Sequence, residues 1–361
     1  MNEQQNGGLG AKPAWFVVHL FAWTVVLTAS ITIAVMLGPV QIHPVQVWNI
    51  AFSHLPLLDS WMDGSWTKAQ EHIVWNIRFP RVLLGAVIGA GLAVAGAAIQ
   101  ALTRNSLADP YILGVSSGAS TAAVLVIIFG AFRFLGIYAL PLSAFAGSLL
   151  AMVLVFVLAK VGGEISTTRL LLSGIVTSMM LSAATNFIVT LAPHADGIRS
   201  AMYWMMGSLT GAKWEHLTVP ALIVAVGAAL LLSLHRSLNS LLMGEEAAVT
   251  LGVNIAAFRI LLVVIAALVT GTIVSVSGSI GFVGLMIPHI ARMMTGSDHR
   301  RVLPLSMLFG AIFMIWADVA ARLVLAPEEL PIGIVTALCG GPFFIWLLRR
   351  STYSFGGGDG K

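Results

Sequence analysis

The stretch RFPRVLLGAVIGAGLAVAGAAIQALTRNSLADPYILGVSSG, residues 78–118, decides the fold class of this chain. An arginine pair precedes 22 uncharged residues crowded with glycine and alanine, and a second apolar run follows a short polar break. A helix needs about 20 apolar residues to cross a bilayer. Of the 361 residues only 9% are charged and 58% are hydrophobic, whereas about a quarter of a soluble domain is charged. The composition indicates an all-α polytopic membrane protein.

The uncharged runs predict the membrane helices. We expect ten spans, two of them inside residues 260–291 and separated at Gly278–Gly281, and the other eight at 15–37, 82–103, 110–132, 134–159, 170–195, 216–235, 302–325 and 330–348. A break at Gly38-Pro39 should leave a short interfacial helix at 42–54. Asp318 and Arg322 lie four residues apart within a span, so they share one helix face and can neutralise each other.

Lysine and arginine predict the orientation, because cytoplasmic loops carry more of them. An even number of spans puts both termini on one side. With the termini inside, 12 of the 19 basic residues fall on the inner face: Lys12, Arg104, Lys160, Arg169, Arg236, Arg259, Arg292, Arg300, Arg301, Arg349, Arg350 and Lys361. We therefore expect cytoplasmic tails at 1–14 and 351–361, flanking a single transmembrane domain at 15–350.

Several function classes are excluded by the sequence. The pI near 9.5 follows from inner-face loops and does not indicate nucleic-acid binding. The single cysteine, Cys339, rules out an intrachain disulfide. No G-x-x-x-x-G-K-[ST] phosphate loop is present, since GGGDGK at the C-terminus has the wrong spacing. If the chain pumps a solute, the energy comes from another polypeptide or from an ion gradient, and we expect no bound cofactor or metal.

Two motifs have an alternative interpretation. Gly85, Gly89 and Gly96 form a small-xxx-small pattern that favours close helix packing. The string Gly114-Val115-Ser116-Ser117-Gly118 fits the G-x-S-x-G nucleophile elbow, with His289 as an imaginable base. That elbow needs a strand before the serine, and the sequence predicts a membrane helix there instead. An intramembrane serine hydrolase is therefore the weakest hypothesis.

An inner loop at 238–259, LNSLLMGEEAAVTLGVNIAAFR, is the most informative extramembrane segment. It predicts a helix from Glu245 to Leu251, a terminating Gly252 and a second short helical stretch after it. Apolar positions at helical spacing fit either a capped loop or a plug for a partner's groove, and the sequence leaves both open.

On the outer face, three arginines lie near predicted helix ends: Arg78, Arg81 and Arg322. Such arginines commonly extend toward the interface with their stems in lipid. Alternatively they form a docking site for acidic residues of an external partner. Arg78 and Arg81 are three residues apart, so both guanidinium groups would lie on one side of the helix start.

The same residues carry a family resemblance. The motifs are IRFPRVLLGAVIGAGLAVAGAAIQALTRNSLADP at 77–110, LGVSSGAS at 113–120, STTRLLLSGIV at 166–176, MYWMMGSL at 202–209, GSIGFVGLMIPHIAR at 278–292, GSDHRRVLP at 296–304, DVAARL at 318–323 and ELPIGIVTALCGGPFFIWLL at 329–348. Together they resemble the FecCD family of ABC-transporter permeases, which import iron–siderophore complexes, haem or vitamin B12. The resemblance implies a type II importer fold, a homodimer or heterodimer of ten-helix permeases, two cytoplasmic ATPase subunits that hold ATP and Mg²⁺, and an external substrate-binding protein.

The resemblance also implies roles for individual residues. Arg78, Arg81 and Arg322 match the arginines that pair with glutamates of the binding protein. The match to the ATPase-coupling helices covers Gly244, Glu245, Glu246, Leu251 and Gly252. The match to the cytoplasmic gate covers Asn105, Leu107, Thr167 and Thr168. Ser106 replaces the family's proline inside that gate segment, which puts the shape of the turn in question.

The predicted function is that of a permease subunit, not an enzyme, in an ATP-driven importer of the inner (cytoplasmic) membrane. Ferric siderophore complexes are the first choice of substrate, with haem and cobalamin as alternatives from the same family. A hypothesis from another class is a proton-coupled secondary transporter that uses Asp318 and His289 as proton carriers, since ionisable groups inside a membrane are usually functional.

Overall fold

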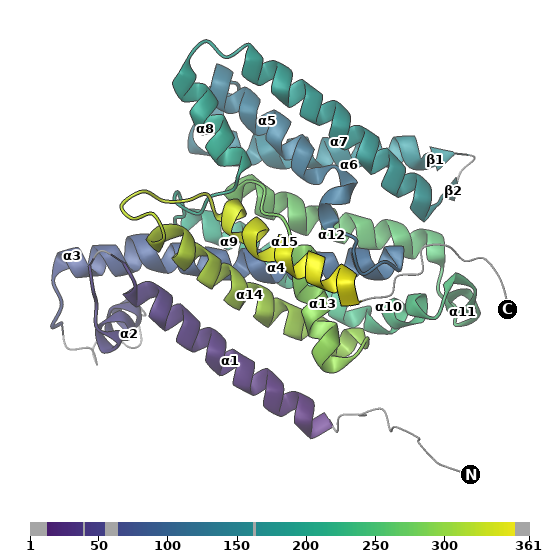
Figure 1. The fold of residues 1–361 in the computed structure, drawn as a ribbon, viewed down its shortest axis with the longest axis horizontal. Coiled ribbons are helices and arrows are strands. Elements are labelled where there is room, and N and C mark those ends of the chain that lie inside the picture. The colour runs from purple at the N-terminus through teal and green to yellow at the C-terminus, as the bar shows by residue number, and fades with distance from the viewer. Residues whose placement is uncertain (1–12, 39, 55–63, 162–163, 351–361) are drawn as a thin grey trace.

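The fold is almost entirely helical (Figure 1). The computed structural model describes residues 13–38, 40–54, 64–161 and 164–350. Most of the predicted N-terminal tail and all of the C-terminal tail at 351–361 lie outside these residues. The described part shows an all-α membrane architecture, as the composition indicates.

Eight helices within the described residues are long and apolar enough to cross a membrane. They are α1 (Pro13–Met36), α4 (Phe79–Thr103), α6 (Ala139–Ala159), α7 (Thr167–Thr190), α9 (Glu215–Ser233), α12 (Ile255–Ser277), α14 (His299–Leu323) and α15 (Ile332–Arg350). The other two predicted spans correspond to shorter helices, α5 (Val115–Phe129) and α13 (Val283–Thr295). Since both fall short of about 20 residues, ten full crossings stay a prediction.

The remaining elements are short. They are α2 (Pro44–Ser53), α3 (Lys68–Glu71), the π-helix η2 (His72–Arg78), the 3₁₀ helices η3 (Pro110–Leu113) and η4 (Arg133–Tyr138), α8 (Ala195–Met205), α10 (His235–Leu242), α11 (Glu245–Thr250), and the strands β1 (Lys160–Val161) and β2 (Glu164–Ile165). The strands pair antiparallel, with Lys160 opposite Ile165. The short helix predicted at 42–54 is confirmed as α2. Helix α8 and the hairpin were not predicted, because neither is long or apolar enough to stand out in a search for spans.

The predicted start of the second span at residue 82 is wrong. Helix α3, the π-helix η2 and α4 form one continuous helical segment from Lys68 to Thr103. The Phe79 amide donates to the Val74 carbonyl, five residues back, so the wider turn carries the helix up to Pro80, which has no amide hydrogen to donate. The charges of Arg78 and Arg81 suggested a helix end in the sequence, yet both residues lie inside this segment.

Helix α4 is the centre of the subunit (Figure 1), and α9, α12, α13 and α14 pack around it. Its glycines lie at the crossings. A side chain at Gly89 would collide with the Gly310 carbonyl of α14, and one at Gly96 would collide with the Gly284 carbonyl of α13. The packing interpretation of these glycines is confirmed. Close backbone contact is the expected basis of helix association in lipid, which supplies no hydrophobic force between helices.

The break between α12 and α13 has satisfied backbone groups. The Ser208 amide donates to the Ser277 carbonyl (2.8 Å). The Tyr111 hydroxyl donates to the Ile280 carbonyl (3.0 Å) and accepts from the Ile280 amide (3.1 Å). Irregular backbone at membrane depth requires such partners, because lipid offers none. The predicted break at Gly278–Gly281 is therefore confirmed and is held by side chains and loops of other helices.

The two ends of the molecule differ in what they carry (Figure 1). Helices α2 and α3 and the α14–α15 connection lie at one end, whereas α10, α11 and the β-hairpin lie at the other. The start of α1 and the end of α15 lie toward this second end, in agreement with an even number of crossings. Together with the charge bias, this makes the α10–α11 end the inner end.

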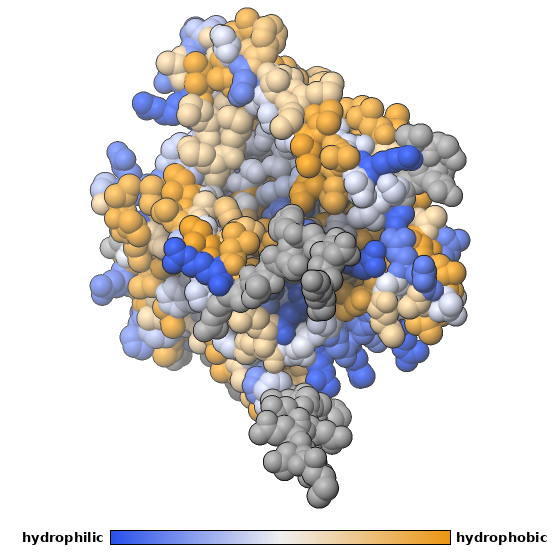
Figure 2. Space-filling view, turned by 45° about the vertical axis from the view of Figure 1, so that its right-hand side comes forward, coloured by the Kyte–Doolittle hydropathy of each residue, from blue (hydrophilic) through white to orange (hydrophobic). Residues whose placement is uncertain are grey.

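Hydrophobic side chains form broad areas of the surface in Figure 2. Many large apolar residues are exposed on the sides of the bundle, among them Phe21, Leu150, Met179 and Phe187. Exposed apolar patches of this extent are unusual on soluble monomers. They are expected where helices meet lipid or another membrane subunit.

The α4–α14 contact gives a paired prediction. Gly89→Ala places a methyl group against the Gly310 backbone, whereas Gly85→Ala meets the end of the Leu209 side chain at 3.3 Å and the Met314 carbonyl at an ordinary contact distance of 3.9 Å. We expect Gly89→Ala to destabilise the detergent-solubilised protein by at least about 1–3 kcal/mol, the usual cost of overpacking, and Gly85→Ala to change it little. Thermal unfolding of both variants measures this. Equal melting temperatures would contradict the close approach of the two helices.

Candidate functional site

Arg81 is the hub of a charge cluster at the outer end. Its Nε donates to Asp318 Oδ1 (2.9 Å), while Nη1 and Nη2 lie 3.0 Å from Glu329 Oε1 and Oε2. Two parallel contacts of this kind are the strongest arginine–carboxylate geometry. Arg81 is thus held by one carboxylate from α14 and one from the α14–α15 connection.

Arg322 and Arg78 complete the cluster and bind the end of α1. Arg322 Nε lies 3.0 Å from Asp318 Oδ2, and its Nη atoms donate to the carbonyls of Leu37 and Ala34. Arg78 donates to the carbonyls of Val35 (2.8 Å), Met36 (3.1 Å) and Val40 (2.8 Å). These are carbonyls at or beyond the last turn of α1, which lack helical partners and carry partial negative charge.

The three predicted docking arginines therefore do lie together, but they are not exposed at a helix start. Arg78 and Arg81 are only 6% and 9% exposed, and each is hydrogen-bonded within the chain. Three guanidinium groups face two carboxylates, so the cluster keeps a net charge of +1. The predicted neutralisation of Asp318 by Arg322 is confirmed, whereas Arg81 as a second partner was not foreseen.

Glu329 is a site residue that the sequence reasoning missed. Its carboxylate also accepts from the Thr210 hydroxyl (3.0 Å), and its backbone carbonyl accepts from the Tyr203 hydroxyl. Burial raises the pKa of Glu329, but the hydrogen bond and charge of Arg81 outweigh it, so the pKa lies below its usual value. Glu329 is therefore ionised at neutral pH. The available signal was an acidic pair, Glu328-Glu329, directly before the last span.

The inner end holds a polar cavity of about 620 Å³. The end of α4, the start of α7, α11 and α12 supply its walls: Leu102, Thr103, Arg104, Ser166, Thr167, Thr168, Arg169, Leu171, Glu245 and Arg259. The predicted gate residues Thr167 and Thr168 thus share a cavity with Glu245 of the predicted coupling helix. Glu245 accepts from Arg259 of α12 (2.9 Å), and Ser166 caps α7 by accepting from the Arg169 amide (3.2 Å).

Asn105 and Leu107 are not among the cavity residues and form the next turn of the chain. Arg104 has φ +48°, and the Asn105 amide donates to the Gln100 carbonyl, which closes α4 in a Schellman-type end. Asn105 Oδ1 accepts from the Leu107 amide (2.9 Å), and its carbonyl accepts from the Ala108 amide (3.2 Å). The turn therefore forms with Ser106 in the position of the family's proline, because Asn105 stabilises it.

Asp109 follows that turn and begins η3. Its Oδ1 accepts from the Tyr111 amide (2.8 Å). Burial raises the pKa of Asp109 to about 6, although this hydrogen bond opposes the shift. The capping carboxylate thus holds the start of η3, which carries Tyr111, and the Tyr111 hydroxyl binds the break between α12 and α13. Neither residue was singled out from the sequence.

The predicted coupling segment is a pair of short helices, α10 and α11, joined at Gly244 with φ +113°. The second helical stretch expected after Gly252 is not a separate helix, because residues from Ile255 onward begin α12. Ala248 of α11 is buried, whereas Val249 and Leu251 are exposed. Gly252 has φ +83°, a backbone conformation that glycine adopts without strain. This pair of helices, residues 235–252 (the knuckle), presents apolar side chains outward.

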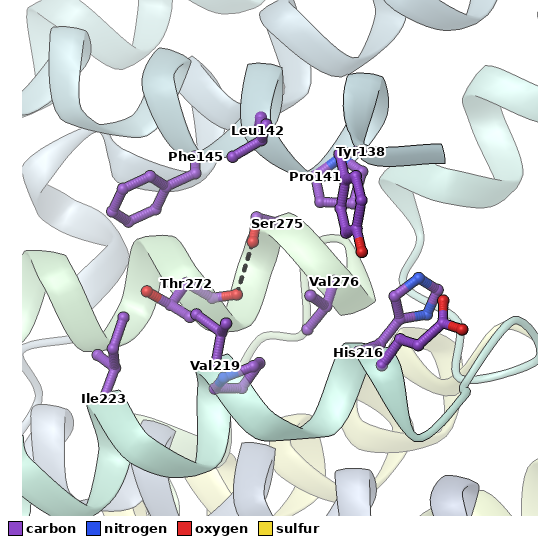
Figure 3. A pocket seen from close by; sticks show the side chains of 12 residues that line it. Tyr138, Pro141, Leu142, Phe145, His216, Val219, Ile223, Thr272, Ser275 and Val276 are labelled. Atoms are coloured by element: carbon purple, nitrogen blue, oxygen red, sulfur yellow. Dashed lines mark hydrogen bonds between the residues drawn. The ribbon is translucent and has the colours of Figure 1, made fainter. Parts of the chain in front are cut away.

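An apolar pocket of about 210 Å³ lies between α6, α9 and α12 (Figure 3). Phe145 and Ile223 lie toward one end, and His216 and Tyr138 toward the other. Ser275 donates to the Thr272 carbonyl (2.7 Å) and so is already bonded. Leu142 and Val219, both in its wall, are exposed on the side of the bundle. The pocket offers apolar surface and no chemistry.

The hydrolase interpretation lacks its structural context. Ser116 and Ser117 begin α5 and are preceded by the 3₁₀ helix η3, not by a strand. The Ser116 hydroxyl lies 2.6 Å from the Ser279 hydroxyl, and His289 packs edge-on against Phe343. Within the described ranges, no group of three His, Cys, Asp or Glu side chains could hold a metal ion.

Comparisons with known proteins agree with this architecture. A model of the FecCD transport family matches residues 26–350. The chain is 46% identical to a cobalamin import system permease protein of Halobacterium salinarum (78% of this chain, 74% of the relative). It is 42% identical to a hemin transport system permease protein of Yersinia pestis (79% and 86%) and 39% identical to an Fe(3+)-citrate import system permease protein of Bacillus subtilis (84% and 89%).

A solved structure has the same fold along nearly the whole chain. It is an inward-facing conformation of a metal-chelate type ABC transporter, which superimposes with a TM-score of 0.80 at 32% identity and covers 93% of this chain and 100% of that one. The chain therefore belongs to the FecCD transport family: it is a multi-pass permease subunit of an ABC transporter and not an enzyme, and ATP is hydrolysed on separate ATPase subunits.

Proposed function

We propose that the chain is the permease of an importer for ferric siderophore complexes in the cytoplasmic membrane. The observation that carries the proposal is the placement of two candidate docking sites at opposite ends of one bundle: the arginine–carboxylate cluster outside, and the α10–α11 knuckle with its exposed apolar side chains inside. Such a chain can receive a loaded binding protein on one face and an ATPase on the other. ATP and Mg²⁺ then belong to the ATPase.

The substrate is proposed from related permeases. Those compared above are described as carrying Fe(3+)-citrate, hemin or cobalamin, and the solved relative as handling a metal chelate. The common chemistry is a metal held by an organic ligand. Cobalamin is the second candidate, because the relative described as a cobalamin permease shares 46% identity.

In the proposed mechanism, two permease subunits enclose a pathway between them. Carboxylates of the binding protein bind the outer arginine cluster, and a groove of the ATPase binds the exposed side chains of α11 in the knuckle. The Glu245–Arg259 ion pair ties α11 to the first turn of α12. Movement of the knuckle would therefore move α12 and the cavity that it shares with the start of α7, where Thr167 and Thr168 lie. Asn105 and Leu107 belong to the same proposed gate.

Uptake by reconstituted vesicles tests the class and the substrate. The permease, its ATPase and its binding protein are reconstituted and offered a ⁵⁵Fe-labelled siderophore, labelled haem or labelled cobalamin. We expect ATP-dependent uptake of the ferric siderophore. Uptake driven by a proton gradient without ATP would contradict the importer proposal, whereas ATP-dependent uptake of cobalamin or haem alone would change only the substrate.

The docking role is tested by comparing Arg81→Gln with Arg133→Gln, since Arg133 is an exposed arginine of η4 and takes no part in the cluster. Because glutamine cannot supply the positive charge that would pair with a carboxylate of the binding protein, we expect Arg81→Gln to raise the Kd for that protein at least tenfold, which is about 1.4 kcal/mol. Arg133→Gln should leave it unchanged. If Arg81→Gln does not fold, Arg81→Lys keeps the charge but loses the two-pronged geometry. A folded variant with wild-type docking would refute the assignment.

The coupling role is tested at Leu251, which is 65% exposed. Leu251→Asp puts a charge into the proposed ATPase contact, and we expect it to reduce ATPase binding and substrate uptake at least tenfold, as for a central interface residue. Leu251→Met is the matched control and should retain both. Because the residue is exposed, thermal unfolding should stay unchanged. Normal uptake by the Asp variant would exclude Leu251 from the contact.

A further inference from the structure

Arg81 has two carboxylate partners that differ sharply in accessibility. The Asp318 side chain is 2% exposed and binds Nε, whereas the Glu329 side chain is 33% exposed and binds both terminal nitrogens. Any carboxylate that reaches Arg81 from outside with the usual two-pronged geometry needs those terminal nitrogens. Such a carboxylate must therefore replace Glu329, while Asp318 can stay in place.

Glu329 also holds the surrounding segments together. Its carboxylate and carbonyl accept from Thr210 and from Tyr203 of α8. Directly after it, the Ile332 amide donates to the Gly207 carbonyl (3.0 Å) and the Gly333 amide to the Met206 carbonyl (3.1 Å). The first turn of α15 is thus bound to the residues that follow α8, and Glu329 fastens this unit to α4 through Arg81.

We propose that Glu329 is an internal substitute for the docking carboxylate: it occupies Arg81 in the free permease and is displaced by a carboxylate of the binding protein. This inference rests on the proposed docking function of Arg81. Displacement frees the α14–α15 connection from α4, while the Leu330 amide stays bound to the Ala321 carbonyl of α14 (2.9 Å) and the start of α15 stays bound to the residues after α8. The movement caused by docking thereby reaches the outer end of α15, while the buried contacts among Arg81, Asp318 and Arg322 stay unchanged.

Two features favour exchange over a permanent ion pair. An external carboxylate can make the same two-pronged contact with Arg81 that the partly exposed Glu329 makes, so the exchange replaces one ion pair by an equivalent one at small net cost. The cluster also has a net positive charge, because Arg78 binds carbonyls only. An approaching anion is therefore attracted before Glu329 leaves, which is the usual effect of complementary charge on association.

The test compares Glu329→Gln with Glu328→Gln, the same change at the neighbouring glutamate. Both variants are assembled with the ATPase and titrated with the binding protein. Removing the competing charge should lower the Kd of the Glu329→Gln complex about threefold or more, and Glu328→Gln should bind like the wild type. An unchanged or higher Kd for Glu329→Gln, or an equal effect of both changes, overturns the proposal.

Two further measurements complete the test. Thr210→Val removes a second hydrogen bond to Glu329 without changing any charge. It should therefore also lower the Kd for the binding protein, but by a smaller factor than Glu329→Gln does. This variant replaces Glu329→Gln in the test if Glu329→Gln does not fold. The ATPase rate without binding protein should rise in Glu329→Gln, because the connection is already released. An unchanged basal rate overturns the transmission to α15.

Arg81→Gln in the same assay distinguishes a failure of the docking function from a failure of the carboxylate exchange. If Arg81→Gln binds normally, the docking function itself has failed. If Arg81→Gln weakens binding and Glu329→Gln does not strengthen it, only the exchange of carboxylates has failed.

Discussion

The close crossing of α4 and α14 at Gly89 and Gly310 is the contact on which the rest of the outer end depends. The two helices run in opposite directions. Arg81 precedes Gly89 by eight residues, and Asp318 follows Gly310 by eight. At 1.5 Å per residue both side chains lie about 12 Å outward from the crossing, where they meet at 2.9 Å. Without the two glycines the backbones would separate, and a buried carboxylate would lose one of its two cations.

A charge inside a membrane protein has to be neutralised, and here that need shapes three elements at once. Asp318 is held by Arg81 and Arg322, and Arg322 and Arg78 also bind the final carbonyls of α1. The guanidinium of Arg78 occupies the space in which a side chain at Gly38 would lie. The peripheral helix α1 is therefore anchored to the central bundle at its outer end by cations of the arginine–carboxylate cluster.

Both ends of the subunit carry a charged contact between helices, but the contact is mostly buried at the outer end and more exposed at the inner end. Outside, a buried core of arginines and Asp318 lies beside the partly exposed carboxylate of Glu329. Inside, an exposed knuckle is joined to α12 by the Glu245–Arg259 pair, beside a polar cavity that also includes the start of α7. Between them the apolar helices contribute packing. This arrangement suits a subunit that transmits movement between two soluble partners and performs no covalent chemistry.

The sequence by itself determined the membrane class, nearly all of the spans, the family and the local pair Asp318–Arg322, because apolar length and i, i+4 spacing act within one helix. It could not determine the partners of Arg81, since Asp318 is 237 residues away and Glu329 is 248 away. For the same reason it placed a helix end at Arg78, where the tertiary structure neutralises the charge and the helix continues. Which charges are buried, and which carboxylate partner of Arg81 is the more accessible one, were decided only when α4, α14 and the α14–α15 connection came together.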